Sequence, residues 1–104
     1  MDNFKIIYKI LKILEKTMDA EEFDNQLISY ETLGISKIRW SKIMKMMLDN
    51  GYIEGVRNIE YDGATSPIIK MINPTITLLG LEYLEENSLM KKAADLAKGI
   101  SNII

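Results

Sequence analysis

The sequence predicts one α+β domain of the winged-helix class, in which a helix-turn-helix is followed by a β-hairpin and then by further helices. Two observations favour this fold. A capped helix with one apolar and one basic face is expected over residues 36–50. A β-prone segment then starts at "GYI", and the turn signal Asp62-Gly63 joins it to a second such segment. The 104 residues suffice for one domain, expected to span residues 1–104.

The helix at residues 36–50 has a marked start and a marked end. The Ser36 hydroxyl can accept a hydrogen bond from a free amide of the first turn. Asn50-Gly51 can adopt the left-handed conformation of a C-terminal cap. Its apolar residues recur at helical spacing and share one face: Trp40, Ile43, Met44, Met47 and Leu48.

A first helix is expected over residues 1–18, with Asp2 or Asn3 as its N-cap. Its main apolar face is expected to consist of Phe4, Ile7, Tyr8, Leu11, Leu14 and Met18. A second apolar stripe contains Ile6, Ile10 and Ile13. A helix this apolar should have neighbours on two sides. Burial between the core and the last helix would provide them, and so would a dimer seam.

The segment between the first helix and the central helix is predicted to complete the helix-turn-helix. Residues 19–26 hold four acids among eight residues and are expected to form a solvated connector. Leu27-Ile28 is expected to form a very short strand. Ser29 can cap a short helix over residues 29–34, which Gly34 would close. A short helix, a glycine-containing turn and a longer helix make a helix-turn-helix.

The predicted hairpin, or wing, spans residues 52–72, with strands at 52–59 and 66–72. Pro67 is placed at the start of the second strand, where a missing amide donor is tolerated. Pro74 is interpreted as the exit from the hairpin.

Two helices are predicted after the hairpin, over residues 77–87 and 88–101, with Thr77 and Ser88 as N-caps. Gly80 costs helix propensity in a first turn, so another backbone is expected to pack closely there.

The predicted core joins the apolar faces of three helices: Trp40, Ile43, Met47 and Leu48 against Leu11, Leu14, Leu81 and Leu84. The remaining apolar surface is expected to form a homodimer interface through the helices at 1–18 and 88–101. Its expected residues are Ile6, Ile10, Ile13, Leu96 and Ile100.

With this order of elements, the chain resembles the YjcQ family of small bacterial and prophage proteins. The residues that carry the resemblance are "LGIS" at 33–36, "GYIEGV" at 51–56, "ITLLGLEYLEEN" at 76–87 and "SLMKKA" at 88–93. It extends over about residues 10 to 99. The resemblance implies a winged helix and supplies no site or substrate.

Four basic residues within nine positions make the central helix a candidate DNA-binding element: Lys37, Arg39, Lys42 and Lys45. With Asp49 they give residues 36–50 a net charge of +3, in a chain whose net charge is −2. Cations on the outer face of a recognition helix neutralise phosphates and donate hydrogen bonds to base edges. The alternative without a binding function is a solvated basic face that keeps the amphipathic helix soluble. The leading interpretation is a small DNA-binding transcriptional regulator.

Other residues favour a protein partner instead of DNA. The wing tip carries Glu60 and Asp62, whose negative charges would repel phosphates. Arg57 and Lys70 are the only basic residues of the predicted hairpin. An outward-facing Ile38 or Met46 would fit a protein as well as a thymine methyl group. The alternative is therefore a winged helix used for protein interaction, such as a prophage accessory factor.

Composition argues against an enzyme. The chain has no cysteine and no histidine, which removes disulfides, thiol chemistry, imidazole acid–base chemistry and Cys/His zinc sites. We expect no cofactor, metal or small-molecule ligand. No apolar run approaches the roughly 18–20 residues that span a bilayer, and lysines interrupt the N-terminal apolar segment. The expected location is the cytoplasm.

Overall fold

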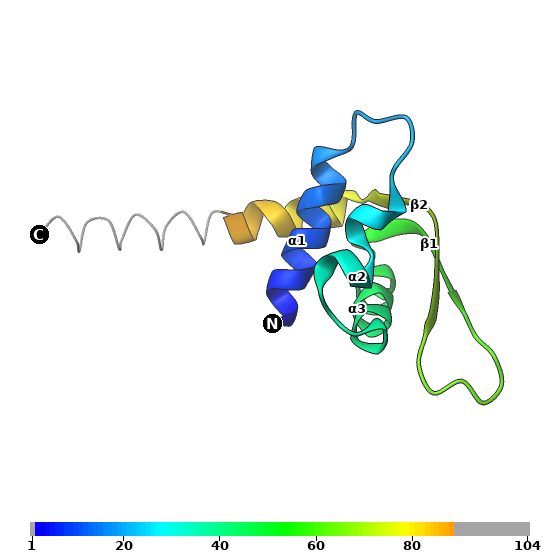
Figure 1. Ribbon diagram of the computed structural model, residues 1–104. Coiled ribbons are helices and arrows are strands. Elements are labelled where there is room, and N and C mark those ends of the chain that lie inside the picture. Colours follow the sequence, from blue (N-terminus) through cyan, green and yellow to red (C-terminus); the bar gives the residue numbers. More distant parts are fainter. Residues whose placement is uncertain (1, 89–104) are drawn as a thin grey trace, which may run out of the picture.

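The computed structural model describes residues 2–88 (Figure 1). The predicted helix at 88–101 lies outside this range except for its first residue. A further helix, over residues 78–88, follows the hairpin. The labelled elements, in chain order, are α1 (Asn3–Lys16), the 3₁₀ helix η1 (Asn25–Ile28), α2 (Tyr30–Leu33), α3 (Lys37–Asp49), β1 (Ile53–Ile59) and β2 (Ile68–Ile76).

The helix starts are set by the side-chain caps that the sequence predicts. The oxygens of Asp2, Ser29 and Ser36 each accept a hydrogen bond from a first-turn amide, at 3.0–3.2 Å. Gly34 closes α2 in the left-handed conformation with φ 70°, a region that L side chains rarely adopt. The helix-turn-helix of α2 and α3 is thus fixed by local sequence signals.

The face that α1 turns to the core differs from the predicted one. The buried residues of α1 are Ile6, Ile10, Leu11 and Leu14. Phe4 and Met18, expected on the main apolar face, are 68 % and 59 % exposed. The helix also ends at Lys16, before Met18. Apolar residues surround most of α1, so helical spacing alone does not decide which stripe points inward; the packing of α3, β2 and η1 decides it.

The burial of α1 takes two residues out of the predicted dimer seam. Ile6 and Ile10 are fully buried within a single chain, so these two side chains are not available to a second copy. Of the other expected seam residues, Ile13 is partly buried against the core, and Leu96 and Ile100 lie outside the described residues.

Residues 25–28 form the 3₁₀ helix η1, so the prediction of a short strand at Leu27-Ile28 was wrong. The Asp24 carboxylate caps this turn by accepting the Gln26 amide at 3.0 Å. Ile28 is fully buried, whereas Leu27 is 40 % exposed. Leu27-Ile28 is therefore part of a 3₁₀ turn, and of the two only Ile28 packs in the core.

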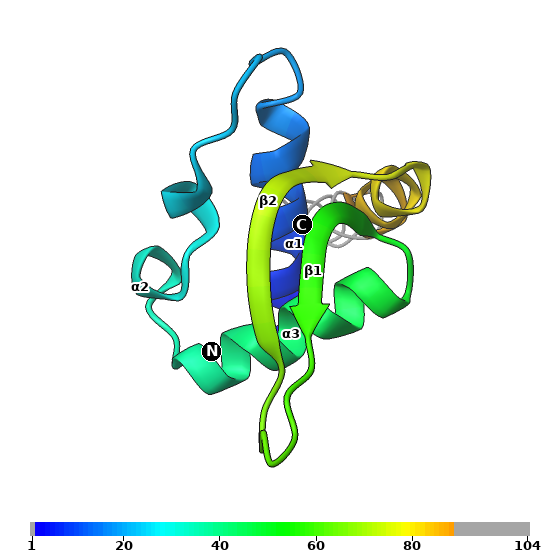
Figure 2. The ribbon, with the colours of Figure 1, turned by 90° about the vertical axis from the view of Figure 1, so that its right-hand side faces the viewer.

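Strands β1 and β2 form an antiparallel hairpin (Figure 2). Gly63, at φ 82°, lies in the predicted turn. The second strand runs to Ile76, so Pro74 is not the exit from the hairpin but a buried residue within β2. The register shifts between Glu54 and Val56, and Pro74 lies in the part of β2 that has no partner residue there. Its missing amide proton therefore breaks no hydrogen bond of the ladder.

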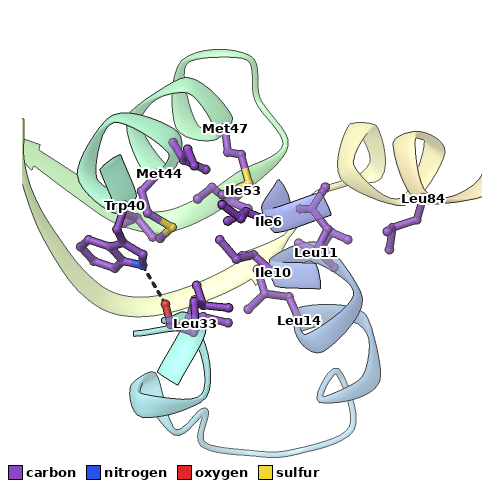
Figure 3. Close-up of a cluster of buried hydrophobic side chains, with 14 residues drawn as sticks. Ile6, Ile10, Leu11, Leu14, Leu33, Trp40, Met44, Met47, Ile53 and Leu84 are labelled. Atoms are coloured by element: carbon purple, nitrogen blue, oxygen red, sulfur yellow. Dashed lines mark hydrogen bonds between the residues drawn. The ribbon is translucent and has the colours of Figure 1, made fainter. Parts of the chain in front are cut away.

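Helix 78–88 joins the core through close backbone contact. As predicted, Thr77 caps it by accepting the Gly80 amide at 3.2 Å, and the same hydroxyl donates to the Gly51 carbonyl. A Cβ on Gly80 would overlap the Tyr52 carbonyl oxygen and Ile76, which confirms the close packing expected there. Leu84 then lies beside Leu11 in the core (Figure 3).

The predicted core is largely confirmed. Trp40, Ile43 and Met47 of α3 are at most 5 % exposed. Leu48 and Leu81 are half-buried at the margin of the core, so the prediction that these two side chains are fully buried is wrong. The hairpin packs against α1 and α3, and its tip extends past α3 (Figure 2).

Candidate nucleic-acid interface

The position of α3 is fixed by buried contacts on its inner face. The indole Nε1 of Trp40 donates a buried hydrogen bond of 2.8 Å to the Ile28 carbonyl of η1 (Figure 3). The Tyr30 ring meets the Trp40 ring edge-on, with centroids 6.0 Å apart. These contacts tie α3 to the two preceding elements, so the orientation of its outer face follows from the core.

The N-terminal half of the outer face is cationic. Lys37, Arg39 and Lys42 are all exposed, and residues 37–42 contain no acid. Ile38 is 59 % and Met46 46 % exposed, so both point outward as expected. The structure also shows an open groove at this site, lined by Asn3, Ser36, Ile38, Arg39, Lys42, Ile43 and Met46. Three of the four predicted basic residues thus share one accessible end of α3.

Lys45 forms an ion pair within α3. Its ammonium lies 2.5 Å from an Asp49 carboxylate oxygen, one helical turn away, and its side chain is 38 % exposed. The hydrogen bond and charge of Asp49 raise the pKa of Lys45, and the Glu60 carboxylate of the wing adds to this. Lys45 is therefore charged but partly neutralised. The i,i+4 spacing of Lys45 and Asp49 signals this pair in the sequence, whereas Glu60 is brought near by the hairpin.

The wing contributes acids next to the C-terminal half of α3. Glu60, Tyr61 and Asp62 are exposed at its tip. Its two basic residues, Arg57 and Lys70, are cross-strand partners, and both are exposed. The charge along α3 is therefore graded, from cationic at its start to near neutral beside the wing.

Within residues 2–88, no group of three or more acidic, cysteine or histidine side chains is arranged to hold a metal ion. In the same part of the chain, no helix has the length and apolar character needed to cross a membrane.

A helix-turn-helix tied to an antiparallel hairpin, with an accessible face on its second helix, defines a protein of the winged-helix class. The chain belongs to the YjcQ family: the family model described as YjcQ protein matches residues 8–103. Among curated proteins and among solved structures, no match was found.

Proposed function

We propose that this protein binds double-stranded DNA as a small transcriptional regulator, with the N-terminal half of α3 in the major groove. The observation that carries the proposal is the placement of Lys37, Arg39 and Lys42 on the exposed end of a helix held by buried contacts. In helix-turn-helix proteins the N-terminal residues of the recognition helix contact base edges. A rigid helix with cations at that end suits this geometry.

The charge gradient determines which part of α3 approaches the phosphates. Residues 37–42 carry a net charge of +3, from three bases and no acid. Towards the other end, Asp49 pairs with Lys45, and Glu60 lies near enough to raise the pKa of Lys45. Phosphates are attracted to the first region and repelled by the acids beside the second. The wing is expected to contribute little.

The side chains of the cationic end have different expected roles. Arg39 is the expected base reader, since a guanidinium can bond bidentately to guanine. Ile38 is the expected apolar contact, because its exposed side chain can meet a thymine methyl group. Lys37 and Lys42 are expected to touch phosphates as flexible point charges.

Fluorescence anisotropy with a labelled mixed-sequence duplex tests the proposal. We expect binding whose affinity falls steeply with salt, because phosphate neutralisation releases counterions. Arg39→Ala should cost about 1–3 kcal/mol on a preferred sequence and relax discrimination at one position. Arg57→Ala is the matched control, an exposed arginine on the hairpin whose loss should change little. Absence of binding at about 100 µM, where typical non-specific binders register, would refute DNA binding.

A protein-interaction module is the second candidate function, and the exposed Ile38 and Met46 favour it. Both side chains line the groove on α3, and the acidic wing tip lies at the other end of the helix. A partner with an apolar anchor would bury such residues. A chain that fails to bind duplex DNA would make this candidate the leading one.

A further inference from the structure

The outer face of α1 carries a basic stripe that the proposed DNA contact does not use. Lys5, Lys9 and Lys16 are exposed, at helical spacings of four and seven residues. Lys12 is paired with Glu15 at 2.8 Å. Four lysines and one glutamate give α1 a net charge of +3.

The outer face of helix 78–88 carries the opposite charge. Glu82, Glu85 and Glu86 are all exposed, and there is no base between Thr77 and Ser88, so this segment has a net charge of −3. Leu84 occupies the opposite side of the helix and is buried against the core. The acids are thus held outward by the packing of Leu84.

The two stripes lie next to each other on one chain. Leu84 packs beside Leu11, so helix 78–88 and α1 are neighbours (Figure 3). Glu85 also adds to the raised pKa of Lys12, for which Glu15 is the main cause. The positive stripe of α1 and the negative stripe of helix 78–88 therefore lie on adjacent helices, and we call the two stripes together the bipolar face.

We propose that this protein forms a two-fold symmetric homodimer in which the basic stripe of α1 meets the acidic stripe of helix 78–88 of a second copy. A two-fold interface requires a surface that is complementary to itself. The bipolar face meets this requirement, because a two-fold rotation places each half on the half of opposite sign. Lys5 and Lys9 are one helical turn apart, about 6 Å along the axis, and Glu82 and Glu86 have the same spacing.

Apolar side chains on the same two helices fit this partner. Phe4 is 68 % and Leu78 71 % exposed, and each lies in the first turn of its helix. Exposed aromatic and aliphatic residues beside paired charges are typical of an interface centre with a polar rim. The interface thus uses α1 through its charged stripe, and not through the buried Ile6 and Ile10.

A charge-swap experiment on the full chain tests the proposal. Sedimentation velocity without DNA measures dimerisation for the parent, for Lys5→Glu/Lys9→Glu and for Glu82→Lys/Glu86→Lys. In a dimer of either variant, α1 of one copy and helix 78–88 of the other carry charges of the same sign, which repel. The dimer Kd of each variant should therefore rise at least about tenfold. An equimolar mixture of the two variants should dimerise again, since every contact in the mixed dimer joins opposite charges. Glu21→Lys/Glu22→Lys, on the exposed connector, is the control and should dimerise like the parent.

Several results would overturn the proposal. A parent that is monomeric at about 100 µM, variants that keep the parent Kd, or a mixture of folded variants that stays monomeric would each do so. Circular dichroism establishes folding. If a double variant unfolds, the single changes Lys9→Glu and Glu86→Lys give the same comparison. Because no DNA is present, the outcome is independent of the proposed DNA binding.

Discussion

Trp40 Nε1 donates a buried 2.8 Å hydrogen bond to the carbonyl oxygen of Ile28, joining α3 to η1 across twelve residues of sequence. Both residues are at most 5 % exposed. The bond therefore satisfies a carbonyl that water does not reach, and it orients the helix whose outer face is the candidate interface.

Trp40→Phe should destabilise the fold by about 1–3 kcal/mol, because it keeps an aromatic ring but leaves the buried Ile28 carbonyl unpaired. Urea unfolding followed by circular dichroism measures the change. Trp40→Ala, which also creates a cavity, should cost about 3–5 kcal/mol. Equal stability of the Phe variant and the parent would show that the bond contributes nothing.

Two glycines should resist substitution for different reasons. Gly80→Ala should destabilise by about 1–3 kcal/mol, since the added methyl group overlaps the Tyr52 carbonyl oxygen and Ile76. Gly63→Ala should cost about 1–2 kcal/mol from its positive φ of 82° alone, because nothing lies within 4 Å of the added atom. Thermal unfolding of the two variants compares them. A neutral Gly80→Ala would contradict the close contact.

Met47 and Leu48 are buried to different degrees, so replacing them with alanine should lower the free energy of unfolding by different amounts. Met47 is 1 % exposed, so Met47→Ala should cost about 2–5 kcal/mol through lost burial and a cavity. Leu48 is half-buried, and Leu48→Ala should cost clearly less. Urea denaturation gives both values, and the reverse order would show that α3 is rotated from the position described.

Charge reversal at the wing should strengthen non-specific DNA binding. Glu60→Lys/Asp62→Lys replaces a repulsion of phosphates by an attraction beside α3. Anisotropy at fixed salt measures the gain. Glu21→Lys/Glu22→Lys changes the net charge equally, but on the connector, and should give a smaller gain. Equal gains would mean that the wing tip does not approach the DNA.

Much of the fold follows from local signals that act through one or two hydrogen bonds. Ser29, Ser36 and Thr77 cap helices because a hydroxyl at that position satisfies a free amide. Gly34 closes α2 because it accepts a positive φ. Gly80 is predicted to lie against another backbone because glycine in a first turn otherwise costs stability. Such features need no knowledge of the rest of the chain.

Features that depend on distant contacts could not be predicted in this way. The inward stripe of α1 depends on the helices and strand packed around it, so the exposed Phe4 was assigned to the apolar face. Pro74 lies inside β2 because the register irregularity of the hairpin removes the need for its amide. At the candidate site, the i,i+4 spacing of Lys45 and Asp49 is a local signal of their ion pair, whereas the approach of the Glu60 carboxylate to Lys45 depends on the hairpin.

The comparison of Lys42→Ala with Lys45→Ala in duplex DNA binding tests the central claim most directly. The two lysines lie three residues apart on α3, but Lys42 belongs to the cationic end and Lys45 is paired with Asp49. Anisotropy titrations across a salt series measure both. Lys42→Ala should weaken binding to all sequences and reduce the salt slope by about 1, whereas Lys45→Ala should leave the slope nearly unchanged. Equal effects of the two substitutions, or a larger effect of Lys45→Ala, would contradict binding through the N-terminal half of α3.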